Sequence, residues 1–175
     1  MATHELHKAK APKKLSFAVI TISNSKFIKF SNGENPEDLS GEKIISSLKE
    51  NAHDVIFHTI IPDQEEMIYG IIDYVIEKFS PDVIVTTGGT GVSYSDVTIE
   101  TLRSLFDKEM EGFGEIFRKL SYEEIGSSAI LSRATAGIYS NTAIFALPGS
   151  PSAVELGIKL ILQEAPHIVK HVKEG

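Results

Sequence analysis

Residues 82–91 read DVIVTTGGTG, an apolar run that passes directly into three glycines. A short, unbroken apolar run bounded by polar residues is typical of a strand buried on both faces of a sheet. Ile99, Leu102, Leu105 and Phe106 follow at helical spacing, so the glycines connect a strand to a helix. This order predicts one unit of a parallel α/β sheet.

The chain on both sides of this unit repeats the alternation of strands and helices. Apolar runs predict three more strands, over residues 15–22, 53–61 and 142–147. Apolar residues at three- and four-residue spacing predict helices that begin after Ser40, at Asp63, near Ile99, after Met110 and after Gly149. The same alternation therefore extends over most of the chain.

Local signals refine the ends of these elements. Ser40 and Thr98 are the expected N-terminal caps of their helices, since their hydroxyls can accept from the first free amide groups. Pro166 should kink or interrupt the last helix, because it lacks an N–H donor. The polar stretch 23–39 is predicted to be a long loop, and a loop of that length in a compact domain is often functional.

The predicted fold class is α/β, with three layers: a doubly wound, mostly parallel sheet with helices on both faces. The chain has 175 residues, 42% of them apolar, which suits one sizeable core, and it shows no internal repeat. We expect a single domain over residues 15–175. The polar and basic residues 1–14 are expected to be a flexible leader.

Composition excludes several classes of function. The net charge of −7 and the presence of only three arginines argue against a nucleic-acid partner. The absence of cysteine excludes disulfides, thiolate zinc sites and a catalytic thiol. No signal peptide is evident, and no apolar run approaches the roughly 20 residues of a membrane span. We therefore expect a cytoplasmic protein with neither nucleic acid nor membrane as a partner.

The glycines at 88, 89 and 91 are the first candidate binding element. Ligands of doubly wound sheets bind outside the carboxyl ends of the strands, where these glycines fall. They allow a tight turn whose amide groups point at a phosphate. The stretch is not a P-loop, because no Lys-Ser/Thr pair follows, and Tyr94 occupies the third glycine position of a dinucleotide fingerprint. A tight turn without a ligand is the alternative interpretation.

Two aspartates are candidates for the chemistry. Asp96 follows the glycines, and since Thr98 is better placed as the cap, Asp96 is predicted to face a ligand. Asp63 could be either a functional carboxylate or a helix cap, because Asp63 and Glu66 have the spacing of a capping box. Both lie at helix starts after strand ends, so both could face one cleft. Two carboxylates near phosphate-binding amides suit Mg²⁺, which prefers oxygen ligands.

The stretch 147–154, LPGSPSAV, is a second candidate turn. Ser150 is placed to cap the following helix and Pro151 to begin it, which again directs amide groups at an anion. From the residues alone, an ordinary turn and cap is the preferred interpretation of this stretch. His167 and His171 could share a metal, but no third ligand accompanies them, so a solvated helix end is preferred and no role is assigned.

The motifs taken together resemble a known family. They occur in order along the chain as DLSGEKI (38–44), TTGGTG (86–91), DVT (96–98), EGFGEIFRKLSYEEIGSS (111–128), SRATAG (132–137) and LPGSPSAV (147–154). Over about residues 15–161 they resemble the molybdopterin adenylyltransferase-like MoaB/MogA family. The stretch 111–128 looks most like the MoaB branch.

The resemblance implies a MogA-like fold and a role in molybdenum or tungsten cofactor biosynthesis. The implied reaction is Mg²⁺-dependent transfer of AMP from ATP to molybdopterin, with release of pyrophosphate. Asp63 and Asp96 would be the catalytic and metal-binding residues. The residues implied to bind ligand are Asp38, Ser40, Gly41, Thr87, Gly88, Gly89, Thr90, Gly91, Glu111, Ser132, Arg133, Pro148, Gly149 and Ser150. Family members form trimers, or hexamers in the MoaB branch, so a homo-oligomer is expected.

The chain departs from the family pattern at two positions. Ser95 and Ile99 stand where the family commonly has Arg and Pro, and losing the arginine removes a phosphate partner. A non-catalytic protein that binds molybdopterin or acts as a scaffold is therefore the alternative hypothesis. A nicotinamide-dependent oxidoreductase is disfavoured by Tyr94 and by the lack of an acidic ribose partner at the expected spacing.

Overall fold

The structure is a computed structural model that describes residues 12–174. Within this part of the chain, six strands form one sheet in the order β2-β1-β3-β6-β5-β4. The strands are β1 (Ser16–Ile22), β2 (Asp54–Ile61), β3 (Val83–Thr87), β4 (Lys108–Glu109), β5 (Thr135–Tyr139) and β6 (Thr142–Leu147). The expected leader spans residues 1–14, and its residues 1–11 lie outside the described part of the chain.

The sheet is mostly parallel, as predicted. β2, β1, β3 and β6 run in the same direction, and each begins within one residue of a predicted strand. β5 pairs antiparallel with β6, and the two-residue β4 pairs antiparallel with β5. These two strands were not predicted. They extend the doubly wound sheet by an antiparallel edge, which is a common addition to such sheets.

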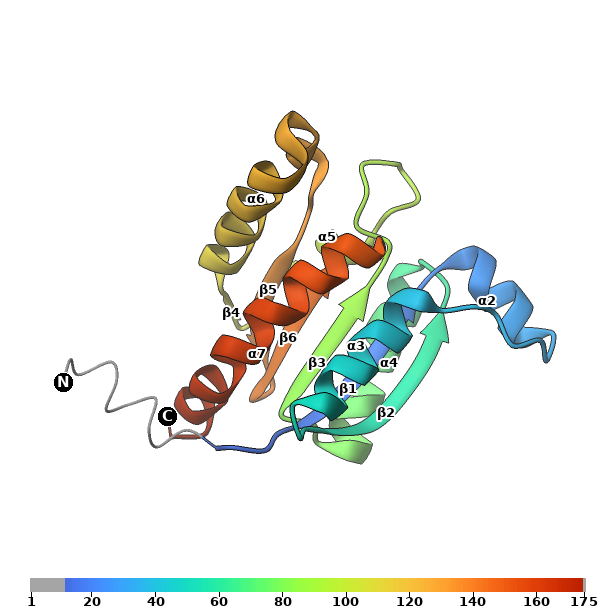
Figure 1. Cartoon of the computed structure of the whole chain (residues 1–175). Helices are drawn as coiled ribbons and strands as arrows, with labels where there is room; N and C mark the ends of the chain where they lie inside the picture. Colours follow the sequence, from blue (N-terminus) through green and yellow to red (C-terminus); the bar gives the residue numbers. More distant parts are fainter. Residues whose placement is uncertain (1–11, 175) are drawn as a thin grey trace.

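The helices cover both faces of the sheet, which confirms the three-layer α/β fold class (Figure 1). They are α2 (Asn24–Ser31), α3 (Leu39–Glu50), α4 (Glu65–Phe79), α5 (Thr98–Leu105), α6 (Glu111–Ile125), the 3₁₀ helix η1 (Gly126–Leu131) and α7 (Pro151–Glu174). None of the helices in the described residues combines the length and apolarity needed to cross a bilayer.

Several local predictions are wrong. The stretch 23–39 is not a loop throughout, because α2 forms within it, capped by Ser23. Asp38 rather than Ser40 caps α3, since its carboxylate accepts from a backbone amide of the first turn. Thr98 is the first residue of α5 and not its cap. Finally, α7 continues through Pro166 without interruption.

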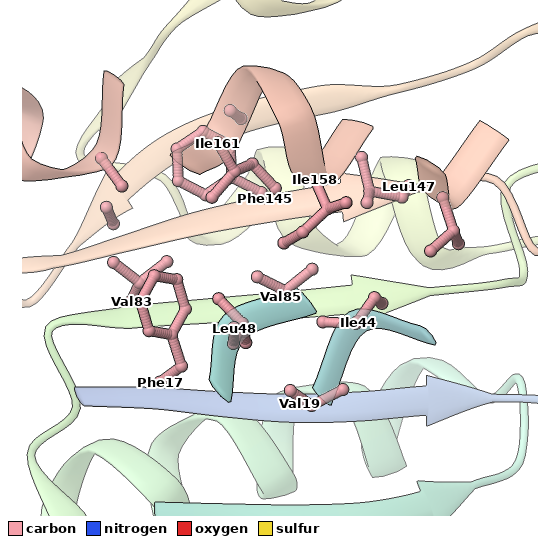
Figure 2. Close-up of a cluster of buried hydrophobic side chains, with 14 of the residues drawn as sticks. Phe17, Val19, Ile44, Leu48, Val83, Val85, Phe145, Leu147, Ile158 and Ile161 are labelled. Carbon is pink, nitrogen blue, oxygen red and sulfur yellow. The ribbon is translucent and has the colours of Figure 1, made fainter. Parts of the chain in front are cut away.

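Successive residues of the central strands enter two separate cores. Val19 and Val85 join the core on one face, where α3 and α7 contribute Ile44, Leu48, Ile158 and Ile161 (Figure 2). Ile20 and Ile84 join the core on the other face, which α4 and α5 cover. Each fully buried aliphatic side chain contributes about 1.5–3 kcal/mol. The sheet, and the loops at its ends, are therefore held in place from both sides.

The four parallel strands end level with one another. Ile22 pairs with Ile61, and Thr87 pairs with both Thr21 and Leu147. The segments that leave these strands therefore emerge together at one edge of the sheet, which we call the carboxyl edge. In Figure 1 this edge lies at the tips of the β1, β2 and β3 arrows, beside the start of α7.

Candidate active site

A buried carboxylate, Asp38, lies beneath the carboxyl edge. Its oxygens accept from Thr21 Oγ1 at 2.5 Å, Lys26 Nζ at 2.9 Å and the Gly41 amide at 3.2 Å, and His58 Nε2 lies 3.6 Å away. Burial alone would raise the pKa of Asp38, but the hydrogen bonds from these four groups outweigh it, so the pKa lies well below its usual range. Asp38 is thus a fixed negative charge that organises the start of α3.

Ser40 connects α3 to the turn that follows β6. Its hydroxyl donates to the Gly149 carbonyl oxygen at 2.7 Å, and the Thr87 hydroxyl donates to the neighbouring Pro148 carbonyl oxygen at 3.2 Å. Ser150 accepts from the Ala153 amide, as expected of the cap of α7. These hydrogen bonds fix the Pro-Gly turn against the ends of β3 and α3.

A cavity of about 250 Å³ opens between these segments. Its lining comes from the end of β1, the start of α2 and α3, and both turns, and comprises Thr21, Ile22, Ser23, Lys26, Ser40, Thr87, Gly88 and Gly149. Hydroxyls and backbone groups dominate this wall, and Lys26 contributes its one cationic side chain. The cavity is suited to an anion such as a phosphate group.

The glycine turn after β3 requires its glycines. Gly88 has φ +99°, and a Cβ there would collide with the carbonyl oxygen of Ile22. Gly89 has φ +63°, and a Cβ there would collide with the Thr98 hydroxyl and lie 2.6 Å from Asp63 Oδ2. Glycine is the residue that adopts such conformations without a steric penalty. The turn is therefore built for close approach of backbone to neighbouring groups.

Asp63 reaches this turn from the end of β2. Its Oδ1 accepts from the Val97 amide at 3.3 Å and from the Thr98 hydroxyl at 3.4 Å. The capping-box alternative is not supported, because Gln64 occupies the cap position of α4 and makes no side-chain cap bond. Burial raises the pKa of Asp63, and the negative charge of Asp96 raises it further. The two candidate catalytic carboxylates therefore interact electrostatically.

Asp96 lies against the far end of the glycine turn. A Cβ at Gly91 would lie 2.5 Å from Asp96 Oδ2, which also accepts from the Ser93 amide at 2.9 Å. Gly89 and Gly91 thus each bring bare backbone against a carboxylate, on Asp63 and Asp96 respectively. A side chain at either glycine would fill this space.

Arg133 braces the same turn from outside. Its Nη1 donates to the Gly91 carbonyl oxygen at 2.7 Å, and its Nη2 forms an ion pair with Glu100. The pKa of Glu100 is lowered, because the hydrogen bond from Arg133 outweighs the effect of burial. Thr90, at the centre of the turn, is buried. Arg133 therefore shapes the turn as well as adding positive charge nearby.

A second cavity, of about 140 Å³, lies on the other side of the Pro-Gly turn. Its lining includes Ser132, Pro148 and Ser150, three of the predicted ligand residues. Glu111 is different: it begins α6, is exposed, and lines neither of these two cavities. The structure thus brings the predicted residues together at the carboxyl edge, apart from Glu111.

Sequence reasoning missed four residues at this edge. Thr21, Lys26 and His58 surround Asp38, and the Asn24 side chain accepts from the Asp63 amide at 2.9 Å. Asn24 and Lys26 fall in the stretch 23–39 that was expected to be functional, so their location was a usable signal. Thr21 and His58 lie within strands, and only the register of β1 and β2 shows that they face Asp38.

These features define a doubly wound α/β domain whose site, formed by two glycine-containing turns, hydroxyl side chains and nearby carboxylates, lies at the carboxyl edge of a parallel sheet. The chain belongs to the family described as "Probable molybdopterin binding domain", whose model matches residues 18–167. The resemblance drawn from the sequence motifs is therefore confirmed.

Curated relatives match the chain over nearly its whole length. The "Probable molybdopterin adenylyltransferase" of Methanocaldococcus jannaschii is 45% identical over 163 residues, which cover 93% of this chain and 97% of the relative. The "Molybdenum cofactor biosynthesis protein B" of Bacillus subtilis is 41% identical over 170 residues, covering 96% of each protein. Among solved structures, the "tungsten cofactor synthesizing protein MoaB from Pyrococcus furiosus" is 42% identical and matches with a TM-score of 0.82. The match covers 93% of this chain and 99% of the chain in that structure.

Proposed function

We propose that this protein acts in molybdenum or tungsten cofactor biosynthesis as a molybdopterin adenylyltransferase, joining AMP from ATP to molybdopterin and releasing pyrophosphate. The observation that carries the proposal is the glycine turn flanked by two carboxylates, Asp63 and Asp96, beside a cavity suited to a phosphate. Two relatives named molybdopterin adenylyltransferase, 45% and 43% identical along almost their full length, support the same conclusion.

The proposed reaction is an in-line displacement at phosphorus. A terminal phosphate oxygen of molybdopterin attacks the α-phosphorus of ATP, a new P–O bond forms, and the bond to the bridging oxygen breaks. Its electron pair leaves with pyrophosphate. Little acid–base chemistry is needed, so the protein accelerates the reaction chiefly by alignment and by electrostatic stabilisation.

The chain's own groups divide this work. Backbone amides of the glycine turn and the Pro-Gly turn would hold phosphate oxygens, and Lys26 would supply a cation from the opposite wall of the cavity. Ser40 and Thr87 keep the Pro-Gly turn in place through its carbonyl oxygens. Alignment of the two substrates therefore depends on three strand ends that the sheet holds level.

The donor set at Asp63 and Asp96 fits Mg²⁺. Both are oxygen donors, both lie against glycine backbone, and burial together with the negative charge of Asp96 raises the pKa of Asp63. No group of three possible metal-ligating side chains occurs among the described residues, so substrate phosphates and water would complete the shell, which is usual for Mg²⁺. When bound, the ion would neutralise the charge that develops on the departing pyrophosphate.

A non-catalytic molybdopterin-binding protein remains the second candidate, because Ser95 replaces the family's common arginine. Ser95 is exposed on the loop between the glycines and Asp96, and its hydroxyl lies 3.2 Å from that of Ser93. Neither serine brings a positive charge to the phosphates. Under this hypothesis the protein binds the pterin without turnover.

One assay separates the two functions. Purified protein is incubated with molybdopterin, ATP and Mg²⁺, and pyrophosphate release and adenylyl-molybdopterin are measured. The proposal predicts both products in equal amounts and none when either substrate is omitted. Saturable molybdopterin binding without pyrophosphate release would leave the non-catalytic binder as the function.

We also propose that the protein is a cytoplasmic homo-oligomer, a trimer or hexamer. Side chains at the end of α6 and in η1 leave apolar area in water, with Ile130 79% and Leu131 61% exposed. Exposed apolar surface of this kind marks interaction sites. Light scattering at micromolar concentration is expected to give a mass of three or six chains, and a monomer would contradict the proposal.

A further inference from the structure

The start of α2 separates two cavities at the carboxyl edge. Ser23 and Lys26 line the cavity of about 250 Å³ that is suited to a phosphate. The adjoining face of the helix lines another cavity, of about 440 Å³, which we call the α2–α4 cavity. Its lining comprises Asn24, Phe27, Ile28, Pro62, Asp63, Gln64 and Met67. Its volume lies within the range of about 300–1,000 Å³ that is usual for small-molecule sites.

Asp63 connects the α2–α4 cavity to the candidate active site. It lines this cavity, and its carboxylate lies against the backbone of Gly89 in the glycine turn. The shared wall is held in place at the end of β2: Asn24 Oδ1 accepts from the Asp63 amide at 2.9 Å, and the Ser23 amide donates to the Ile61 carbonyl oxygen at 2.9 Å. Figure 1 shows α2 beside the tip of the β2 arrow. A ligand bound at the glycine turn can therefore extend past Asp63 into this cavity.

The lining of the α2–α4 cavity is largely apolar and includes no cationic residue. Four of its seven residues are apolar, and two of these, Ile28 and Met67, are 61% and 39% exposed. Apart from Asp63, its polar side chains are the neutral amides of Asn24 and Gln64. Because Asn24 Oδ1 accepts from the Asp63 amide, its Nδ2 is the group left to donate to a ligand. Such a lining fits an uncharged planar ring better than a phosphate.

The substrates of the proposed reaction carry two planar ring systems, adenine and the pterin. The polar edge of adenine consists of ring nitrogens and one amino group, whereas the pterin adds a carbonyl group and ring N–H groups. Polar groups that lose water without gaining a partner weaken binding, so a mostly apolar lining with two amides suits adenine better.

We propose that the α2–α4 cavity binds the adenine ring of ATP, an inference that rests on the proposed adenylyltransferase function. Phe27 and Met67 pack against the ring, and Asn24 Nδ2 donates to one of its nitrogens. The triphosphate then extends past Asp63 toward the phosphate cavity on the other face of α2. Phe27 thereby contributes to nucleotide affinity without contact with the reacting atoms.

Two phenylalanines of α2 provide a matched test. Phe30 belongs to the same helix, is 47% exposed and does not line the α2–α4 cavity. In calorimetry with Mg²⁺, the ATP affinity of Phe27→Ala should fall about tenfold, as expected for the loss of one base-stacking contact, whereas Phe30→Ala should bind ATP as the unmodified chain does. Tripolyphosphate, which lacks the base, should bind all three proteins equally. Equal ATP affinities in the two variants, or an equal loss of tripolyphosphate affinity in Phe27→Ala, would overturn the assignment.

Methionine methyl resonances provide a second readout in the full chain. Met110 does not line the α2–α4 cavity and serves as the internal control. In protein with labelled methionine methyl groups, ATP should shift the Met67 resonance through the ring current of adenine and leave that of Met110 unchanged. Tripolyphosphate should shift neither. A Met67 resonance that does not respond to ATP would contradict the proposed location of the ring.

Binding and turnover separate this inference from the proposed function. Molybdopterin affinity should be the same in Phe27→Ala and in the unmodified chain, and a loss of molybdopterin affinity in place of ATP affinity would overturn the assignment to adenine. ATP binding that depends on Phe27, without pyrophosphate release when molybdopterin is added, would support the adenine cavity and at the same time exclude the adenylyltransferase.

Discussion

The backbone of Gly89 lies directly against the carboxylate of Asp63, so that a Cβ on this glycine would be 2.6 Å from Asp63 Oδ2 and would also collide with the Thr98 hydroxyl. The Thr98 amide in turn donates to the Gly89 carbonyl oxygen at 3.0 Å. A segment that follows β3 is thereby joined to residues that follow β2 and begin α5. This contact is the centre of the candidate active site.

Gly89→Ala should disrupt the site more than the fold. The alanine must adopt φ +63°, which costs about 1–2 kcal/mol, and its methyl group must displace Asp63 or Thr98. We expect a lower midpoint of unfolding and loss of most pyrophosphate release. Gly70→Ala is the matched control, because Gly70 lies in α4 with no atom within 4 Å of its Cβ position. That variant should gain about 0.5–1 kcal/mol and keep full activity.

Asp96→Asn tests charge at nearly constant shape. The asparagine oxygen can still accept from the Ser93 amide, so the loop should keep its conformation. If the carboxylate holds Mg²⁺, the variant should fold and bind molybdopterin normally but lose most of its turnover. Asp73→Asn, on the surface beside Tyr139, serves as the control and should remain active. Turnover of Asp96→Asn close to that of the unmodified chain over a range of Mg²⁺ concentrations would exclude this role.

Lys26→Met tests the cation on the cavity wall. Lys26 lines the cavity beside Gly88 and is held by Asp38 at 2.9 Å. A hydrogen bond to a charged group contributes about 1.5–3 kcal/mol, so the affinity for pyrophosphate should fall about tenfold or more. Lys43→Met removes an exposed ion pair with Glu155 instead and should leave that affinity unchanged. Equal affinities in the two variants would show that Lys26 does not contact the anion.

The central sheet could be predicted from the sequence, whereas its antiparallel edge could not. β1, β3 and β6 are almost continuously buried, and an unbroken apolar run signals such a strand directly. β5 reads TAGIY, where Gly137 weakens the strand signal but allows the Phe106 ring to approach its backbone. β4 has two residues and is defined only by its pairing with β5. Such pairing depends on tertiary contacts, so the sequence of β4 alone does not predict a strand.

The candidate site likewise has parts with a local sequence signal and parts that depend on tertiary contacts. The glycine turn, Asp63 and Asp96 are recognisable because motif residues follow strands in sequence. α2 escaped prediction because none of its residues is buried, so it has no apolar stripe facing a core. The surroundings of Asp38 depend on a contact between β1, β2 and the start of α3, which local sequence does not encode. Thr21 and His58, which meet Asp38 only through this contact, were therefore missed.

Asp38 should make stability depend on pH in the acid range. Its pKa is lower in the folded protein than its ordinary value of 3.8, so the folded state releases this proton more readily than the unfolded state. Its contribution is present at and above pH 4 and is lost as pH falls below that. Asp38→Asn should lose about 2–3 kcal/mol at pH 7 and show less acid dependence. Urea unfolding between pH 7 and pH 3 measures both, and parallel pH profiles for the two proteins would contradict this role.

Asp63 should have the opposite effect, because burial and the charge of Asp96 raise its pKa in the folded protein. The folded state then holds this proton more tightly than the unfolded state, so stability falls as pH rises through the carboxyl range and stays lower at neutral pH. With chelator present at pH 7, Asp63→Asn should therefore unfold at a higher temperature than the unmodified chain. Mg²⁺ should raise the unfolding temperature of the unmodified chain by neutralising the two carboxylates, but should raise that of the variant much less.

Asp63→Asn should at the same time lose turnover, since a destabilising charge is kept where function needs it. Thermal unfolding with and without Mg²⁺ checks the prediction, and an equal Mg²⁺ response in both proteins would remove Asp63 from the metal site.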